Sequence, residues 1–393
     1  MTEGNTWKER EIEVRHQNLP LFPYLSGAMS PGPPASPRIS LADYERDAER
    51  VLDPGAFGYY VGGAGDELTL RDNLAAWRRW AILPRVLTGV GERDPSVEVL
   101  GRRRPHPLVI APMAFQRLAH PDGELATAVA AAQTSAVMCL STLSTSGLDA
   151  VAESAPEATR WFQVYVFRDR GVTREMVSQA VQHGYEALVV TVDLPIMGVR
   201  ERDLRSGVDA AASAVPSALA AGARNSLTPA DFAGLIDPDL RWADIEKLVA
   251  ESPLPVVVKG VLAPEDAVLA AEHGARGVVV SNHGGRQLDT VPAGADALPA
   301  VVEAAGDRLD VLVDGGIRRG TDVLKALALG ARAVMVGRPV LWGLAVDGPT
   351  GAATVLRILL GELDAALALT GSPRAGELSQ AVVRRTAWEV PAR

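Results

Sequence analysis

The sequence predicts an α/β protein, a (β/α)8 TIM barrel, and three observations lead to this fold class. Eight short runs rich in β-branched residues recur along the chain. Ala- and Leu-rich amphipathic segments lie between them, and the runs are apolar throughout rather than alternating. Near-continuous apolar strands are buried on both faces, which is typical of parallel sheets covered by helices. Eight strand–helix units favour a closed barrel over an open, doubly wound sheet.

The predicted strands follow one another at short intervals. They are LVIAPMAF (108–115), AVMCLST (136–142), RWFQVYV (160–166), ALVVTVD (187–193), PVVVKG (255–260), GVVVSN (277–282), DVLVDGG (310–316) and AVMVGRP (333–339). Helical spacing predicts helices between them, over 123–135, 173–184, 243–252, 264–274 and 320–330. Segments 265–282 and 321–338 also resemble each other, as expected of two units that share one packing solution.

Residues before the first predicted strand and after the fourth one do not follow the strand–helix alternation. Residues 1–40 are rich in proline and small residues and predict an N-terminal arm, which leaves 41–393 as a single domain. Helices are expected over 40–52, with Ser40 as the N-cap, and over 67–80, whereas 96–107 is typical of a short hairpin. After the fourth strand, about 201–242 is too long for an ordinary connection, so we expect a lid over the carboxyl face of the barrel.

Composition narrows the class of protein. The 393 residues are 47% hydrophobic and 22% charged, as in an ordinary globular protein. The net charge of −9 argues against broad binding to nucleic acids or anionic membranes. The single cysteine, Cys139, excludes a disulfide within the chain and indicates a reducing compartment. A polar start and the lack of an apolar stretch of about 18 residues predict a cytoplasmic protein without a membrane span. Neither an HExxH nor a CxxC motif is present, so we expect no metal site.

Polar side chains gather at or just beyond the carboxyl ends of the predicted strands. They are Gln163, Tyr165, Thr191, Asp193, Lys259, Ser281, Asn282, His283, Arg286, Asp314, Arg318 and Arg338. In a barrel these strand ends meet at one mouth, which is where active sites lie. The sequence therefore predicts one site built from loops that are far apart in the chain.

The loops after the seventh and eighth strands predict a phosphate site. DGGIRRG (314–320) and VGRP (336–339) combine arginines with glycines, which let backbone N–H groups approach an anion. These two loops usually hold phosphate in barrels. The alternative is a pair of tight turns with surface arginines, but the position of both motifs favours phosphate.

Lys259 and the pair His283 and Asp193 are further candidates for residues that take part in a reaction. Lys259 ends a buried strand, which is costly unless the ammonium group is paired or neutralised. A Schiff base, a phosphate contact, a partner for an electron sink that becomes anionic and a structural ion pair all remain open for it. His283 and Asp193 follow two strands that end on the same rim of the barrel. Their side chains are therefore candidates for a base and the carboxylate that orients it. A lone histidine is more often structural, but Arg286, suited to a substrate carboxylate, favours catalysis.

Eight motifs together resemble the FMN-dependent 2-hydroxy acid oxidase/dehydrogenase family. SNHGGRQLD is the most specific; LPVVVKG precedes it, and DGGIRRGTDVLKALALGA and GRP follow it. YYVGGAGDELTLRDN, IAPMAFQRLAHPDGE, FQVYVFRDR and TVDLPIMGVRERD extend the resemblance over residues 40–370. The resemblance implies FMN as the cofactor and oxidation of an (S)-2-hydroxy acid to a 2-keto acid. Hydride and carbanion routes both require a base.

The resemblance also implies a role for each matching residue. It implies FMN contacts at Pro112, Met113, Ala114, Ser141, Gln163, Thr191, Lys259 and Ser281. It implies phosphate contacts at Asp314, Gly315, Gly316, Arg318, Gly337 and Arg338. The substrate carboxylate would lie between Tyr59 and Arg286 with Arg200 nearby, Tyr165 would bond the substrate hydroxyl, and His283, backed by Asp193, would be the base.

One position departs from glycolate oxidase, which has a tryptophan where this chain has Leu143. The smaller side chain predicts room for an acid larger than glycolate, unless a residue from 201–230 refills the space. We expect oxygen to reoxidise the flavin and give hydrogen peroxide. Oxidative decarboxylation, as in lactate 2-monooxygenase, and a quinone or other carrier are the alternatives. The resemblance suggests a homotetramer.

A protein of another class is the remaining alternative. An FMN barrel that acts on a modified peptide, an isomerase or a non-catalytic flavin protein would be expected to lose the His283–Arg286 pair, which this chain retains.

Overall fold

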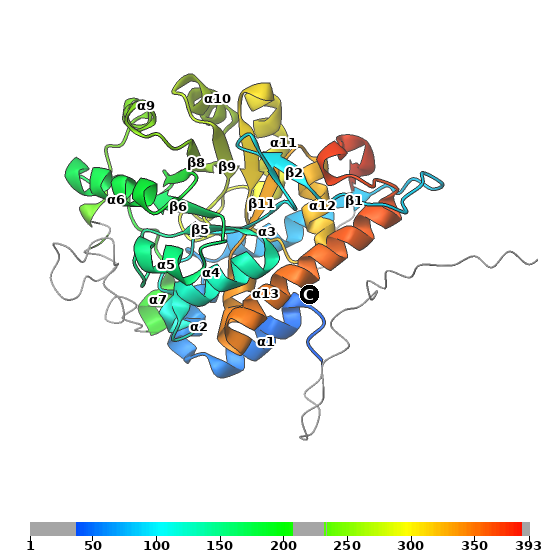
Figure 1. Ribbon diagram of the computed structural model, residues 1–393, viewed down its shortest axis with the longest axis horizontal. Coiled ribbons are helices and arrows are strands. Elements are labelled where there is room, and N and C mark those ends of the chain that lie inside the picture. Colours follow the sequence, from blue (N-terminus) through cyan, green and yellow to red (C-terminus); the bar gives the residue numbers. More distant parts are fainter. Residues whose placement is uncertain (1–36, 207–231, 233, 387–393) are drawn as a thin grey trace, which may run out of the picture. The chain divides into compact units, whose positions relative to one another are not determined.

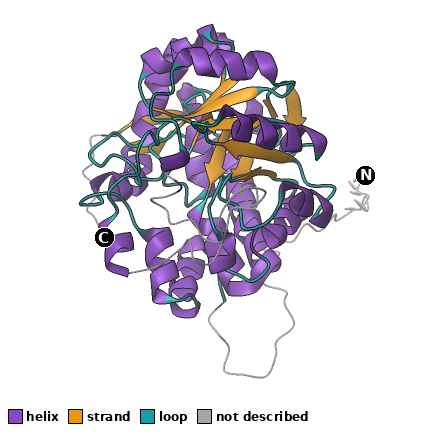
Figure 2. Ribbon diagram, turned by 90° about the vertical axis from the view of Figure 1, so that its left-hand side faces the viewer, coloured by secondary structure: helices purple, strands orange, loops and turns teal. Residues whose placement is uncertain are grey.

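Eight parallel strands close into a barrel in the computed structural model, which describes residues 37–206, 232 and 234–386 (Figures 1 and 2). The strands are β4 (Leu108–Ile110), β5 (Val137–Leu140), β6 (Arg160–Val164), β7 (Leu188–Thr191), β8 (Val256–Val261), β9 (Gly277–Val280), β10 (Asp310–Val313) and β11 (Ala333–Val336). Each strand pairs with the next, and β11 pairs with β4 to close the ring. The predicted (β/α)8 barrel is therefore confirmed.

Helices surround the barrel, as Figure 2 shows. They are α4 (Gly123–Thr134), α5 (Leu148–Ser154), α6 (Arg170–Gln182), α9 (Trp242–Glu251), α10 (Pro264–Glu272), α11 (Gly294–Ala305), α12 (Gly320–Ala328) and α13 (Arg338–Thr370). The five predicted helices are confirmed to within a few residues. The strands are shorter than the apolar runs because the chain leaves the sheet early; β4 ends at Ile110, and the rest of its run builds a loop at the mouth.

Additional elements precede the barrel. The predicted first helix is α1 (Leu41–Val51), and the Ser40 hydroxyl and N–H group both donate to Asp43. It is followed by α2 (Pro54–Val61). The predicted hairpin is confirmed by β2 (Val97–Val99) and β3 (Arg102–Arg104), which pair antiparallel. The segment α13, whose helical backbone is interrupted at Asp347 and Gly348, packs against α1, α4 and α12 (Figure 1).

The predicted helix over 67–80 is too long. The helix α3 spans Leu68–Ala76, and a single 3-10 turn, Trp77–Arg79, follows it. Trp80 instead begins β1 (Trp80–Ile82), because this backbone pairs with the last strand, β12 (Val383–Arg385). That partner lies so far along the chain that no local pattern indicates the pairing.

Two predicted regions fall wholly or partly outside the described residues. Residues 1–36 of the expected arm lie outside them, so the boundary near residue 40 stays a prediction. Residues from Ser40 onward form one compact unit. Within the expected lid, 207–231 and 233 lie outside the described residues, and the helix α7 (Glu201–Ser206) begins the segment. Among the described helices, none is long and apolar enough to cross a membrane.

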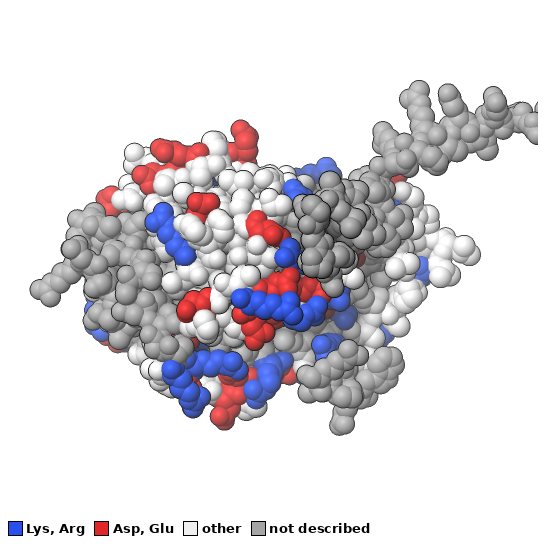
Figure 3. Space-filling model, turned by 90° about the horizontal axis from the view of Figure 1, so that it is seen from below, with Lys and Arg blue, Asp and Glu red and all other residues white. Residues whose placement is uncertain are grey.

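The charged surface is mixed on the face that Figure 3 draws. Lys and Arg side chains lie among Asp and Glu side chains there. Opposite charges pair in the structure, as in Arg93–Asp364 and Arg202–Glu67, each with a shortest N–O distance of 2.6 Å. Such exposed pairs contribute little to stability. The basic side chains of this face therefore do not form one continuous basic surface.

Candidate active site

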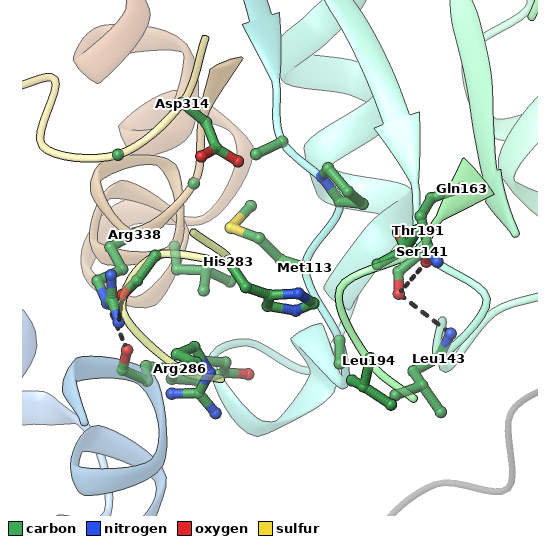
Figure 4. Close-up of a pocket in the computed structure, with 18 of the residues that line it drawn as sticks. Met113, Ser141, Leu143, Gln163, Thr191, Leu194, His283, Arg286, Asp314 and Arg338 are labelled. Atoms are coloured by element: carbon green, nitrogen blue, oxygen red, sulfur yellow. Dashed lines mark hydrogen bonds between the residues drawn. The ribbon is translucent and has the colours of Figure 1, made fainter. Parts of the chain in front are cut away.

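A cavity of about 590 Å³ lies among the loops that follow the carboxyl ends of the strands. This volume is within the range of about 300–1,000 Å³ that is typical of small-molecule sites. The structure brings the predicted site residues together here: all of them line the cavity except Asp193, Ser281 and Asn282. Figure 4 shows Arg286 and Arg338 on one side, Ser141, Leu143 and Gln163 on the other, and His283 between them.

His283 and Asp193 form a hydrogen-bonded pair. The His283 Nδ1 atom lies 2.8 Å from Asp193 Oδ1. Burial raises the pKa of Asp193, but the charge of His283, its hydrogen bond and Lys259 outweigh burial, so the pKa is lowered. An ionised carboxylate only accepts, so the proton between them lies on Nδ1 and Nε2 keeps its lone pair. Burial also lowers the pKa of His283, and Asp193 only partly opposes this. The ring is thus suited to act as a neutral base.

Three successive residues after β9 have left-handed backbones. They are His283 (φ 57°), Gly284 (φ 65°) and Gly285 (φ 73°). The His283 N–H group donates to Ser281 Oγ at 3.0 Å. A Cβ on Gly285 would lie 2.8 Å from the backbone of Leu70, so only glycine fits against α3. The glycines let the chain turn sharply enough to aim both His283 and Arg286 into the cavity.

Lys259 carries its charge deep in the barrel. Its Nζ atom donates to Ser281 Oγ at 2.9 Å and lies 3.2 Å from Asp314 Oδ2. Burial lowers the pKa of Lys259, but Asp314 and Asp193 outweigh burial and raise it, so the ammonium stays charged. Lys259 is therefore in a structural ion pair and also lines the cavity. Ser281 does not line the cavity, and its Oγ accepts from this ammonium group, so its predicted contact with FMN stays a prediction.

The arginines of the last two loops form a cationic corner. Arg338 donates from Nε to the Tyr60 carbonyl at 2.8 Å and from Nη2 to two further carbonyls. Burial, with the charges of Arg286 and Arg318, lowers the pKa of Arg338 to about 9. The Arg318 guanidinium lies 4.8 Å from the centre of the Trp342 ring, and burial lowers its pKa too. Buried cations whose pKa values are lowered are stabilised by a bound anion.

The glycines of the phosphate loop are required by their surroundings. Gly315 and Gly316 have φ values of 90° and 78°. A Cβ on Gly316 would lie 1.8 Å from the Asn73 carbonyl oxygen on α3. The Asn73 side chain forms a reciprocal amide pair with Asn282, at 2.9 and 2.8 Å. The helix α3 therefore packs so closely against these loops that only glycine fits.

A second pair of arginines lies toward the substrate end of the cavity. Arg286 donates from Nη1 to the carbonyls of Tyr59 (2.6 Å) and Gly62 (2.9 Å), and its guanidinium lies 4.8 Å from the Tyr59 ring centre. Arg200 donates from Nε to the Arg286 carbonyl at 3.0 Å. Burial, with the charge of Arg286, lowers the pKa of Arg200 to about 10. Both guanidinium groups line the cavity and present donors suited to a carboxylate.

Several cavity residues were not predicted. Asp203 Oδ2 lies 3.7 Å from Arg286 Nη2 and 3.8 Å from Arg200 Nη1, and burial raises its pKa. Asp203 lies in the first turn of α7, three residues after Arg200, and this spacing is the signal that would have indicated it. Phe232 packs edge-on against Tyr165, with ring centres 5.6 Å apart. Further apolar lining comes from Phe115, Leu194, Met197, Val199, Leu204, Met335 and Leu341.

The cavity fits FMN by two observations on its own residues. The Nε2 atom of Gln163 is buried and has no hydrogen-bond partner among the described residues, although its Oε1 accepts from the Thr142 N–H group at 3.0 Å. Such an unpaired donor is satisfied by a polar ligand. At the other end, Arg318 and Arg338 need the negative charge that a phosphate brings. Among the described residues, no cluster of His, Cys, Asp and Glu is arranged to hold a metal ion.

Comparisons with known proteins agree with this geometry. The model of the FMN-dependent dehydrogenase family matches residues 48–385. L-lactate oxidase from Nostoc sp. is 49% identical over 346 residues, which cover 85% of this chain and 94% of that protein. Human 2-hydroxyacid oxidase 1 is 45% identical over 362 residues, covering 88% and 96%.

Solved structures give the same result. Mandelate oxidase with (S)-2-phenylpropionate is 41% identical, with a TM-score of 0.79 over 88% of this chain and 98% of that one. A soluble mutant of the membrane-associated (S)-mandelate dehydrogenase from Pseudomonas putida is 35% identical, with a TM-score of 0.83 over 88% and 99%. The chain therefore belongs to the FMN-dependent dehydrogenase family, and FMN is its cofactor.

Proposed function

We propose that this enzyme oxidises an (S)-2-hydroxy acid to the 2-keto acid, with His283 as the base. The observation that carries the proposal is the 2.8 Å His283–Asp193 pair, whose imidazole lines the same cavity as Arg286. A base and a carboxylate-binding group in one cavity are what a 2-hydroxy acid requires. The names of the relatives, which include L-lactate oxidase and 2-hydroxyacid oxidase, support this reaction.

The substrate carboxylate binds the two arginines of the substrate end. Arg286 is held by the carbonyls of Tyr59 and Gly62, so its fork is oriented before substrate arrives. Arg200, with a pKa lowered by burial, gains most from a partner anion. Charge-assisted bonds of this kind fix the orientation of the acid as well as its affinity.

The proton of the substrate passes to His283 Nε2. Asp193 holds the ring through Nδ1 and stabilises the imidazolium that forms. Burial raises the pKa of Tyr165, so its hydroxyl stays protonated and can donate to the substrate oxygen. When bound, FMN supplies the electron acceptor of the reaction. Gln163, Ser141, Thr191 and Lys259 would hold its ring system, and the loops at 314–318 and 337–338 its phosphate.

We further propose that oxygen is the final acceptor and gives hydrogen peroxide, that the substrate is larger than glycolate and that the enzyme is a cytoplasmic homotetramer. The two oxidases named above are more similar in sequence than the mandelate dehydrogenase, which supports oxygen. Leu143 lines the cavity and leaves room that a tryptophan would fill. Oxidative decarboxylation and transfer to a carrier are the competing outcomes. Light scattering tests the tetramer.

The test uses the purified holoenzyme in two steps. Anaerobic addition of L-lactate, glycolate or (S)-mandelate should bleach the flavin absorbance with at least one acid; no bleaching with any 2-hydroxy acid would reject the proposal. In air, one peroxide per keto acid is expected. Decarboxylated acid without peroxide would indicate a monooxygenase, and no reoxidation by oxygen would indicate a dehydrogenase.

A further inference from the structure

Phe115 has a backbone conformation that bulky residues rarely adopt. Its φ and ψ values of 56° and 44° lie in the left-handed region, which disfavours any residue with a Cβ. Such strain persists only where the surrounding structure enforces it, and it clusters at functional sites. Phe115 directly follows the loop 112–114, which lines the cavity.

Three hydrogen bonds enforce this conformation. The Phe115 N–H group donates to the Leu143 carbonyl at 3.0 Å, and the Tyr60 hydroxyl donates to the Phe115 carbonyl at 2.7 Å. The N–H group of the next residue, Gln116, donates to Glu124 Oε1 at 3.0 Å. The partners come from the loop after β5, from α2 and from the first turn of α4, so three separate elements fix one residue.

Glu124 connects the loop after β4 to the loop after β5. Its side chain is fully buried, and Oε1 also accepts from the Thr145 N–H group at 3.0 Å. Oε2 accepts from the hydroxyl groups of Thr145 and Ser146. A buried carboxylate is costly unless it is well hydrogen-bonded, and here donors from both loops satisfy it. Removing the carboxylate would release both loops at once.

The constraint aims the Phe115 ring at the substrate end of the cavity. The ring packs against Tyr59, with centres 6.2 Å apart, and against Leu143, and both of these residues also pack against the main core. These three side chains line the cavity. The Arg286 guanidinium also lies over the Tyr59 ring, so these apolar side chains adjoin the group that is proposed to bind the carboxylate.

We propose that Phe115 determines specificity for the side chain of the hydroxy acid and that Glu124 is the residue that positions it. The apolar wall, defined as Tyr59, Phe115 and Leu143, favours acids with branched aliphatic or aromatic side chains. This inference rests on the proposed function for the orientation of the acid. The carboxylate binds Arg286, and the substituent on Cα then packs against the wall.

The test measures binding of two unreactive acids to the holoenzyme, phenylacetate and acetate, by the change that each produces in the flavin spectrum. Phe115→Leu should raise the Kd of phenylacetate about tenfold and change that of acetate by at most about twofold, since deleting apolar contact changes selectivity by 10- to 200-fold. Phe57→Leu, the same substitution on α2 outside the cavity, should change neither Kd. Equal effects on both acids, or none, would overturn the role of Phe115.

Glu124 is tested by two substitutions. Glu124→Ala should lose selectivity for phenylacetate over acetate as Phe115→Leu does, whereas Glu124→Gln, which keeps an oxygen for both N–H groups, should retain most of it. Glu153→Ala on the exposed side of α5 is the control. A merely structural role predicts equal weakening of both acids, and that result would overturn the assignment. The flavin absorbance checks that each variant is folded and loaded.

These binding measurements do not depend on turnover. If the wild-type enzyme oxidises no 2-hydroxy acid but the two acids still bind with the expected selectivity, the proposed function fails and the apolar wall stands. If the wild-type enzyme turns over a 2-hydroxy acid but Phe115→Leu binds phenylacetate and acetate with wild-type selectivity, the role of Phe115 in specificity is wrong and the proposed function stands.

Discussion

The cavity has a cationic side, formed by arginines, and an apolar side, formed by Tyr59, Phe115 and Leu143, and different interactions hold the two in place. On the cationic side, Arg286 and Arg338 are held by backbone carbonyls, and burial leaves several guanidinium groups with lowered pKa values. On the apolar wall, the Tyr59 and Phe115 rings and Leu143 pack against one another, and the backbone of Phe115 is strained. In the proposed function, the cationic side binds the carboxylate that all the substrates share and the phosphate of the cofactor. The apolar wall recognises what differs among acids.

His283 stands between the two sides, and changing it has the largest expected effect. His283→Gln should lower kcat by about 10²–10⁴-fold, the usual contribution of a general base, while FMN stays bound. Turnover and flavin absorbance measure the two properties separately. His273→Gln, at the end of α10, is the matched control and should leave both unchanged. A yellow and fully active His283→Gln enzyme would end this assignment.

Arg286→Lys tests the cationic side. Lysine keeps the charge but loses the fork that the Tyr59 and Gly62 carbonyls orient, so kcat/KM should fall about 10²-fold, the loss expected for one partner of a buried, charge-assisted pair. The loss should be similar for small and bulky acids, because all carry the carboxylate. Arg276→Lys, an exposed control directly before β9, should have no effect. If kcat/KM fell only for bulky acids, Arg286 would not bind the carboxylate that all the acids share.

The pH profile of kcat/KM follows from the state of His283. The base acts only when neutral, and burial holds its pKa below the ordinary value of 6.5, so activity should persist below pH 6.5 and then fall about tenfold per pH unit. In Asp193→Asn the carboxylate that raises this pKa is lost, so the acid limb should move to still lower pH while kcat falls. An acid limb above pH 7 in the wild-type enzyme would contradict the assignment.

Leu143→Trp tests the apolar wall and has the smallest expected effect. The larger ring should fill space beside Phe115 and shift the ratio of kcat/KM for glycolate over (S)-mandelate by about tenfold toward glycolate. Leu74→Trp, on the exposed part of α3, is the control. An unchanged ratio would show that Leu143 does not set the size of the substrate.

The sequence predicts the barrel and the His283–Asp193 pair because both depend on local signals: apolar runs, and polar residues where those runs end. It does not predict Phe115 in a left-handed conformation, since the enforcing bonds come from Tyr60, Leu143 and Glu124, whose proximity is visible only in the folded chain. Trp80 begins a strand for the same reason. Ser281 matches its motif, but the motif does not indicate that its hydroxyl accepts a hydrogen bond from Lys259.

Closure of the barrel has a consequence for how the chain is made. The pairing of β11 with β4 joins Val334 to Leu108, and β12 then pairs with β1 near the end of the chain. During synthesis from the N-terminus, β4 has no partner on one side until more than half the chain has followed it. Bringing such distant segments together is slow, and exposed strand edges pair readily with other chains. The hydrogen-bonded ring that leaves the finished barrel without an edge therefore leaves β4 with an unpaired edge until β11 has been synthesised, and such an edge can pair with other chains.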